Sequence, residues 1–450
     1  MNYRQIIYFT ILCGFLFLCR GMGFTVDEVD GAGAKDRVWK TSPKRVNVDE
    51  NLSFIYHRDQ SSELTTIQVF INGGKKAVPQ NREGLAFLTT RLAIEIPVRS
   101  DVKKLMTLGS SSLTGVEGDF SILTIRCLTE KLEETLKIFT PVIKKPLFSS
   151  LRIYNIKKNM KHYRKNEEDH PETIMMQEYL NAFFGTTGYG GSKYGTTESI
   201  KKIKKKDIVA FYKKYFNLAN MTISISSDLS ETEITGLLKK YFLYFPAGEK
   251  RHVSPPVRSL PLSEPGERFV TKDNTQTLVS LGALLPGSSP RNFTCAFMLE
   301  NILGEGMGSK LWPLRAEKNL AYHLGAKITH MNDAAILRVY LKTDNSKKEK
   351  ALQALKEIMT ELYREGITQE EFLATKIRSR AYFLRNNETK EARTYNMAFF
   401  ESIGPGFEFL EGFFNSLDSI TKEEFNSYIK EVLEPGRLLQ VIVGPETPKD

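Results

Sequence analysis

The sequence predicts an α+β fold of two homologous domains, each a mainly antiparallel β-sheet with helices packed on it. Two observations support this fold class. Residues 207–228 and 424–445 align without a gap, and each copy reads as an amphipathic helix followed by an apolar strand. Strands also occur in hairpin-like pairs and helices in runs, a grouping that argues against alternating βαβ units. A repeat of this length indicates duplicated domains rather than a solenoid.

Hydrophobic periodicity places the elements along the chain. In the first half, alternating or continuous apolar residues predict strands at 53–56, 65–71, 119–128 and 221–226. Apolar residues three or four positions apart predict helices at 83–94, 129–142, 151–164, 174–184 and 207–216. The second half repeats this order, with strands at 267–272, 276–285, 320–328, 335–342 and 438–443, a helix at 291–303 and further helices up to 433.

A cluster of prolines marks the boundary between the two halves. The segment 246–266 has few apolar positions and contains Pro246, Pro255, Pro256, Pro261 and Pro265. Because proline fixes φ and lacks an amide donor, such a segment crosses a surface as a semi-extended strap. We therefore predict a signal peptide at 1–23, an N-terminal domain at 24–245, a linker at 246–266 and a C-terminal domain at 267–450.

The first residues are typical of an export signal. Arg4 gives a short basic start, residues 6–18 form an apolar run, and residues 21–23 supply small side chains for cleavage. The run is short for a bilayer span of about 20 residues, and an uncleaved N-terminal anchor is the alternative. We expect an exported protein, periplasmic or extracellular, without a stable membrane span after cleavage.

Charge and cysteine content argue against some classes of function. Part of the formal net charge of +10 comes from lysine-rich helical patterns at 157–165 and 201–206, without interleaved aromatic residues in a sheet-like pattern. This is typical of solvated helix faces, so we expect no nucleic-acid partner. Outside the signal only Cys127 and Cys295 remain, one in each half. They predict two buried free thiols rather than a disulfide framework.

Residues 84–91, with the sequence GLAFLTTR, follow the first pair of predicted strands. They resemble the Gly-Leu-Ala-His-x-x-Glu-His zinc helix of the pitrilysin/insulinase family of zinc metallopeptidases, whose members are built from clamshell-paired homologous domains. In that motif two histidines bind zinc and the glutamate is general base. Phe87, Thr90 and Arg91 replace all three groups. Phenylalanine has no lone pair, threonine is a poor base and arginine repels a dication, so we expect no metal in this chain.

The resemblance also indicates where the third zinc ligand and the substrate strand of the family would be. The ligand is a glutamate before an acidic-Pro turn, which residues 169–171 resemble, so its place falls near Tyr163. Glu167 and Glu168 are the alternatives, although one carboxylate without the histidine pair would not retain zinc. Residues 109–114 stand where the family has a strand that pairs with substrate, but they lack its asparagine.

Residues 304–322 join a Gly/Ser-rich stretch to the sequence LWPLRAEKNLAY and resemble the family's C-terminal Arg/Tyr signature. We predict that Arg315 and Tyr322 project from this segment, whose Gly/Ser-rich entry opens a helix. In the family this pair lies opposite the zinc and donates hydrogen bonds to the substrate carbonyl and the oxyanion. Asn319 stands where the family usually has glycine. The alternative is that Arg315 pairs with a carboxylate such as Glu317 and Tyr322 fills a strand position.

A chain without the metal half but with the Arg/Tyr half resembles the non-metal subunit of heterodimeric members of this family. The resemblance implies a zinc-less subunit of an exported heterodimeric metallopeptidase that cleaves unfolded peptides. Such a subunit would be inactive alone and bind no cofactor, with zinc expected in a homologous peptidase partner. The alternative is a peptide-binding or assembly protein of the same fold without a proteolytic role. An enzyme of unrelated chemistry is disfavoured because no nucleophile and base constellation is visible.

Overall fold

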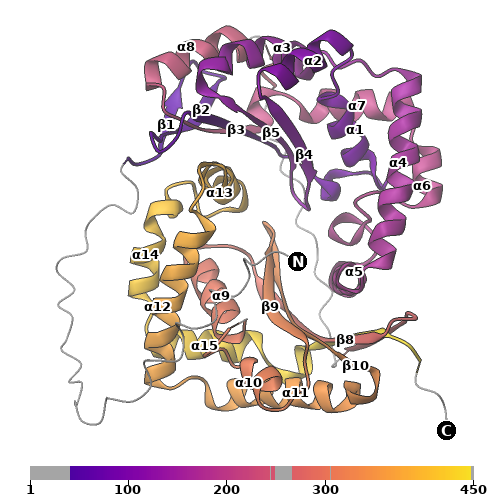
Figure 1. The fold of residues 1–450 in the computed structure, drawn as a ribbon, viewed down its shortest axis with the longest axis vertical. Coiled ribbons are helices and arrows are strands. Elements are labelled where there is room, and N and C mark those ends of the chain that lie inside the picture. The colour runs from indigo at the N-terminus through magenta and orange to yellow at the C-terminus, as the bar shows by residue number, and fades with distance from the viewer. Residues whose placement is uncertain (1–40, 244, 249–265, 305, 447–450) are drawn as a thin grey trace, which may run out of the picture. The chain divides into compact units, whose positions relative to one another are not determined.

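The first half of the chain folds into a six-stranded sheet with helices packed on it (Figure 1). The computed structural model of the protein describes residues 41–243, 245–248, 266–304 and 306–446. The strands are β1 (Lys44–Asn47), β2 (Ser53–Arg58), β3 (Leu64–Ile71), β4 (Ser111–Val116), β5 (Ser121–Leu128) and β6 (Met221–Ser227). The helices are α1 (Leu85–Ala93), α2 (Arg99–Thr107), α3 (Leu132–Lys144), α4 (Ser150–Asp169), α5 (Pro171–Phe184), α6 (Thr197–Lys202), α7 (Lys205–Tyr215) and α8 (Glu231–Phe242).

The second half builds a five-stranded sheet and a longer series of helices (Figure 1). Its strands are β7 (Gly266–Thr271), β8 (Gln276–Pro286), β9 (His323–His330), β10 (Ala334–Asp344) and β11 (Leu439–Gly444). Its helices are α9 (Pro290–Leu303), α10 (Trp312–Ala316), α11 (Lys348–Glu365), α12 (Gln369–Asn386), α13 (Lys390–Ile403), α14 (Phe409–Ser419) and α15 (Lys422–Val432).

The two sheets share one strand order. The first runs β1-β2-β6-β3-β5-β4 and the second β7-β11-β8-β10-β9, so that β7 corresponds to β2, β11 to β6 and β9 to β4. Among the described strands, the only parallel pairs are β2 with β6 and β7 with β11. The predicted α+β class with mainly antiparallel sheets is therefore confirmed.

The internal repeat also holds in detail. Helices α7 and α15 have the same length, and each is followed by a 3₁₀ turn, Leu218–Asn220 or Pro435–Arg437, that leads into β6 or β11. Asp207 and Glu424 occupy the same place in the first turn of these helices. Each carboxylate accepts a hydrogen bond from the N-cap backbone amide, at 2.7 and 2.9 Å. The acid therefore satisfies an amide that the helix leaves without a partner.

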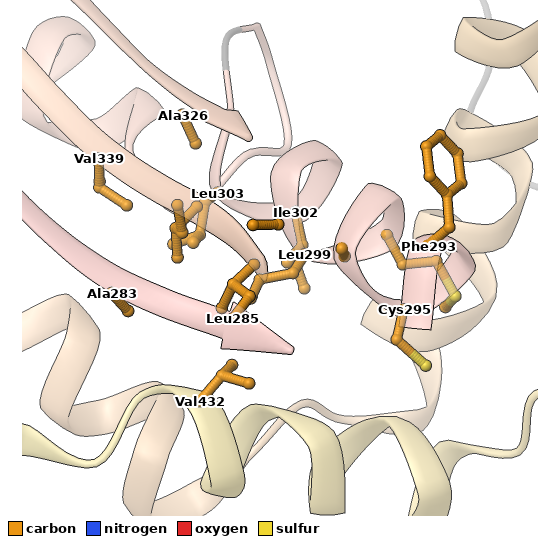
Figure 2. Packing of buried hydrophobic residues seen from close by; sticks show 14 of the residues in the cluster. Ala283, Leu285, Phe293, Cys295, Leu299, Ile302, Leu303, Ala326, Val339 and Val432 are labelled. Carbon is orange, nitrogen blue, oxygen red and sulfur yellow. The ribbon is translucent and has the colours of Figure 1, made fainter. Parts of the chain in front are cut away.

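The core of the second half lies between its sheet and the helices that carry apolar faces. Figure 2 shows Leu299, Ile302 and Leu303 of α9 close to Leu285 of β8 and Val339 of β10. All five side chains are almost fully buried. This packing removes apolar area from water and fixes α9 on the sheet.

Each sheet is also covered by a helix that belongs to the other half of the chain. Helix α13 lies on β3 and β6, with the ring of Tyr395 5.2 Å from that of Phe70. Helix α5 lies on β8 and β11, where the buried Tyr179 hydroxyl is hydrogen-bonded to Ser280. The two helices occupy corresponding places in the repeat, so the exchange is reciprocal.

Most predicted elements are found within a few residues of their expected bounds, but hydrophobic periodicity did not place β1, β4, α2, α6 or α8. Strand β1 is short, and α2 buries only Leu105, which gives no periodic signal. Helix α8 carries a clear signal, because Ser230 and Glu233 form a capping box ahead of buried Ile234 and Leu238. As predicted, Cys127 and Cys295 are buried free thiols. The predicted signal at 1–23 and most of the predicted linker at 246–266 lie outside the residues that the structure describes.

Within the described part of the chain, no helix combines the length and apolar character needed to cross a bilayer.

Candidate functional site

Helix α1 carries the three residues that stand in the zinc motif, and their environments differ. It begins after Gly84, whose φ of 89° favours glycine, and a Cβ there would lie 2.7 Å from the carbonyl oxygen of Tyr194. Thr90 is fully buried, and its hydroxyl has no hydrogen-bond partner among the described residues. Phe87 is partly buried and Arg91 is exposed. None of these side chains can act as a general base toward water at neutral pH.

Phe87 packs in a cluster of three aromatic rings. Its centroid is 6.0 Å from that of Tyr163 and 4.8 Å from that of Tyr194, with the rings edge to face. The two tyrosine rings are 5.4 Å apart. Tyr163, which stands near the place expected for the third ligand, thus contacts Phe87 at the first ligand position of the motif. Edge-to-face packing of this kind stabilises a helix pair by about 0.5–1.5 kcal/mol per ring pair.

These residues do not fit a zinc ion. Zinc in proteins is held by three or four imidazole, thiolate or carboxylate ligands, and rings stand at two of the positions where ligands are expected. In the described residues, no group of three or more His, Cys, Asp or Glu side chains is arranged to hold a metal. Of the alternative ligands, Glu168 pairs with Arg164 at 2.7 Å, and Glu167 lines a separate cavity.

The segment with Arg315 and Tyr322 differs from the predicted helix. Helix α10 has only five residues, and Tyr322 lies outside it, directly before β9. The helix stops because the amides of Glu317 and Lys318 both turn back to the carbonyl oxygen of Pro313, each at 3.0 Å. The predicted helix is therefore present but short, and it carries Arg315 but not Tyr322.

Asn319 adopts the left-handed backbone conformation that the turn requires, with a φ of 48°. Asparagine tolerates this region better than most residues other than glycine, which explains how it replaces the usual glycine. The turn is held because Lys347 donates to the carbonyl oxygen of Asn319 at 3.3 Å and pairs with Asp344 at 3.1 Å. Asp344 in turn accepts a hydrogen bond from the Tyr322 hydroxyl at 3.0 Å.

Arg315 and Tyr322 are both exposed on this fixed segment. The Arg315 guanidinium lies over the ring of Trp312 at 5.9 Å, and no ion pair joins it to Glu317 although the structure describes both residues. Tyr322 is 56% exposed, and its amide donates to the carbonyl oxygen of Lys342 at 2.9 Å, which extends the β9–β10 ladder. Among the described contacts, none links either side chain to α1. Within one chain the predicted site residues therefore stand in two separate places.

Strand β4 forms one edge of the first sheet. Of the strands that the structure describes, β4 pairs only with β5, and Leu113 on it is 51% exposed. An edge strand presents unpaired backbone groups to which another extended chain can add. The corresponding edge in the second sheet is β9, where Glu300 already accepts a hydrogen bond from the amide of Ile328 at 2.9 Å. A side chain thus already satisfies one backbone amide on the β9 edge, whereas the β4 edge is open to another extended chain.

Comparison with known protein families fits this architecture. A family model described as Insulinase (Peptidase family M16) matches residues 53–197, and one described as Peptidase M16 inactive domain matches residues 202–378. The chain belongs to the M16 peptidase family. Within M16, it is a homologue whose zinc motif on α1 has been replaced.

Individual relatives are similar over most of the chain. Non-peptidase homolog YmxG of Helicobacter pylori is 24% identical over 404 residues, which cover 87% of this chain and 91% of the relative. An uncharacterized zinc protease of Rickettsia bellii is 26% identical over 318 residues, 68% of this chain and 74% of the relative. A crystal structure of a peptidase M16 inactive domain from Pseudomonas fluorescens superimposes with a TM-score of 0.83 over 91% of this chain and 99% of that one, at 19% identity.

Sequence reasoning did not find Tyr194 or the polar network behind Tyr322. Tyr194 is at least 103 residues after every motif position on α1, and it contacts Phe87 only in the folded chain. A signal was present, because Tyr194 precedes Gly195, whose φ of 81° and close approach to the carbonyl oxygen of Glu83 require glycine. The Lys347–Asp344–Tyr322 network depends on the hairpin register and has no local pattern.

Proposed function

We propose that this protein is the zinc-less subunit of an exported heterodimeric M16 metallopeptidase that cleaves unfolded peptides. The observation that carries the proposal is a contrast within the chain. Helix α1 offers no zinc ligands and no general base, whereas Arg315 and Tyr322 are exposed on a segment fixed by backbone and side-chain hydrogen bonds. Similarity to both a non-peptidase homolog and a zinc protease supports a family in which the two forms coexist.

The two side chains suit the stabilisation of negative charge on oxygen. Arg315 carries a permanent charge and several N–H donors. The hydrogen bond that the Tyr322 hydroxyl donates to Asp344, together with the charge of that carboxylate, raises the pKa of Tyr322, so the phenol stays protonated. In the complex, Arg315 would donate to the substrate carbonyl oxygen as charge develops on it. Tyr322 has a single O–H, so it would donate to the same oxygen by turning away from Asp344. A zinc ion bound by the partner would supply the activated water.

The exposure of these residues explains why the chain would need a partner. Hydrogen bonds to a developing oxyanion are worth most in a site that excludes water. Tyr322 is 56% exposed, and Arg315 is exposed as well. A second chain covering this segment would exclude water and bring the metal to it.

The test is reconstitution with a zinc-bearing M16 homologue from the same source. The two chains are mixed, and hydrolysis of an unfolded peptide is compared for the wild type, Arg315→Ala and Tyr322→Phe. We expect no hydrolysis by this chain alone. In the mixture, each substitution should lower kcat by about 10²–10³-fold. The matched control is Lys318→Ala, an exposed cation in the same segment. Unchanged turnover in both site variants would remove the catalytic role.

The open edge of β4 supports a second candidate, a peptide-binding or assembly protein without proteolysis. An extended peptide can add to this edge through backbone hydrogen bonds. Thr114→Pro on β4 removes one amide donor and should weaken peptide binding measured by fluorescence anisotropy. If the mixture binds peptide through β4 but never hydrolyses it, the binding role replaces the subunit role.

A further inference from the structure

A cavity of about 360 Å³ lies apart from the segments discussed so far. Its walls come from the start of the 3₁₀ turn after β3, the β4–β5 turn, α4, α5, the end of β9 and α13. Neither Arg315, Tyr322 nor the three motif positions of α1 line it. The volume falls within the range of about 300–1,000 Å³ that is usual for small-molecule sites.

Besides Asp119, which lies near Lys76, two cations and two anions line this cavity without pairing with one another. They are Lys75, Lys193, Glu117 and Glu167. Among these described side chains, no ion pair within bonding distance is formed, although each of the other three acts electrostatically on Lys75. Lys75 donates instead to the carbonyl oxygen of Gly191 at 3.1 Å, and Lys193 lies over the ring of Tyr194 at 5.6 Å. The two lysines and the two glutamates therefore line the same cavity without forming ion pairs.

The neighbouring residue shows that direct pairing is available in this fold. Lys76 contacts Asp333 at 2.5 Å and lies 3.6 Å from Asp119, and it also donates to the hydroxyl of Tyr189. Lys75 has no such partner among the described side chains, and burial lowers its pKa to about 8. Burial also raises the pKa of Glu167. Charges that are partly desolvated and unpaired cost free energy, which a ligand carrying complementary charges would recover.

The rest of the cavity wall is mixed in polarity. Asp119, Thr173, Gln177, Thr329 and His330 contribute polar groups, and the apolar part is formed by Phe120, Met176, Leu180, Ile328, Met331 and Phe399. Such a wall favours a ligand with one hydrophobic group next to its charged end. The combination of both signs of charge with an apolar wall selects against simple anions and simple cations.

We propose that this cavity binds a small zwitterion of the α-amino-acid class with an apolar side chain. Its carboxylate lies toward Lys75 and Lys193, its ammonium group lies toward Glu117 and Glu167, and its side chain packs on the apolar wall. The site is independent of the proposed peptidase role, since it uses none of the residues assigned to that role. A free amino acid would bind here whether or not a zinc-bearing partner is present.

The first experiment is calorimetric titration of the full chain with L-phenylalanine, N-acetyl-L-phenylalanine and L-phenylalaninamide at pH 7. Each modified compound lacks one of the two charges. We expect L-phenylalanine to bind and each modified compound to bind at least about tenfold more weakly, because a charge-assisted hydrogen bond is lost. No heat of binding with millimolar L-phenylalanine, or equal affinity for the three compounds, would overturn the proposal.

Variants then assign each charge to its partner. Lys75→Met should reduce the discrimination between L-phenylalanine and its amide, whereas Glu167→Gln should reduce the discrimination against the N-acetyl compound. The matched controls on α4 are Lys158→Met and Glu168→Gln, which do not line the cavity and should keep both ratios. Thermal unfolding of each variant reports folding separately. If both ratios persist in Lys75→Met and Glu167→Gln, or if a blocked tripeptide binds as tightly as L-phenylalanine, the site is not a zwitterion site.

Discussion

Lys75 and Lys76 are adjacent in sequence, but the protein compensates the charge of Lys76 and leaves that of Lys75 desolvated. Lys76 is paired with Asp333 and lies beside Asp119, so its charge is compensated inside the protein. Lys75 keeps one hydrogen bond to a carbonyl oxygen, and burial lowers its pKa from 10.5 to about 8. At neutral pH its protonated form therefore costs free energy in the folded state.

This difference predicts a pH dependence of stability. Below about pH 8 Lys75 is protonated in both states and the cost is fully present. As the pH rises from about 8 toward 10.5, the unfolded chain keeps a proton that the folded chain has lost, so the wild type gains stability relative to Lys75→Met. The gain should approach about 1.4 kcal/mol per pH unit. Urea unfolding of both proteins at several pH values measures it, with Lys158→Met as control. A difference that stays constant with pH would contradict the assignment.

At the scale of elements, α13 is attached to the first sheet by buried charge. Arg393 pairs with Asp59, and both side chains are 7% exposed. Although burial acts to raise it, hydrogen bonds from Ser61 and Arg393 hold the pKa of Asp59 below its usual range. Lys390 donates to three backbone carbonyl oxygens at 2.7–2.8 Å, including those of Asp59 and Leu64. The helix of one half thus satisfies polar groups at the end of β2 and the start of β3.

Breaking this pair from one side should be costly. We expect Arg393→Met to lower the free energy of unfolding by about 3–5 kcal/mol, because the Asp59 carboxylate is left buried without its partner. Adding Asp59→Asn should recover part of the loss, so that the two changes are not additive. The control is the exposed pair of Arg380 and Asp418, 41% and 59% exposed. There Arg380→Met should cost at most about 1 kcal/mol. A similar small cost for Arg393→Met would show that the buried pair is not the attachment.

At the scale of the whole molecule, the reciprocal exchange of α5 and α13 joins the halves into one folding unit. Helix α13 covers β3 and β6, and α5 covers β8 and β11. The side chains of α5 that include Met175, Tyr179 and Phe183 are buried in a cluster with the second sheet. Neither half can bury all its apolar surface alone.

Separate halves should therefore fold poorly. A fragment of residues 41–248 loses the α13 cover of its sheet and leaves the apolar face of α5 without a partner. We expect it to bind a hydrophobic dye and to lack a cooperative thermal transition, because this uncovered area weakens the core. Co-expression with residues 266–446 should restore a soluble complex, detected by gel filtration. A cooperative, monomeric fragment of 41–248 would show that the exchange is not required for folding.

The sequence by itself determined the fold class, the repeat, most elements and the replacement of the zinc motif on α1. These features are encoded locally. Apolar periodicity and capping acids such as Asp207 and Glu424 specify helices and strands, and Phe87, Thr90 and Arg91 lack ligand atoms or basicity whatever surrounds them. The length of α10 was not determined in this way, because the carbonyl of Pro313 captures two amides and Asn319 turns the chain.

Only the tertiary structure decided which residues meet across long stretches of chain. The ring cluster of Phe87 with Tyr163 and Tyr194, the exchange of α5 and α13, and the unpaired charges around Lys75 all join segments that are distant in sequence. Burial changes the energetics of such groups. The charge of Lys76 is compensated by a carboxylate partner, whereas the neighbouring Lys75 is desolvated without one among the described residues. Periodicity and motifs carry no information about these environments, because the dielectric surroundings and partners of a side chain arise only when the chain is packed.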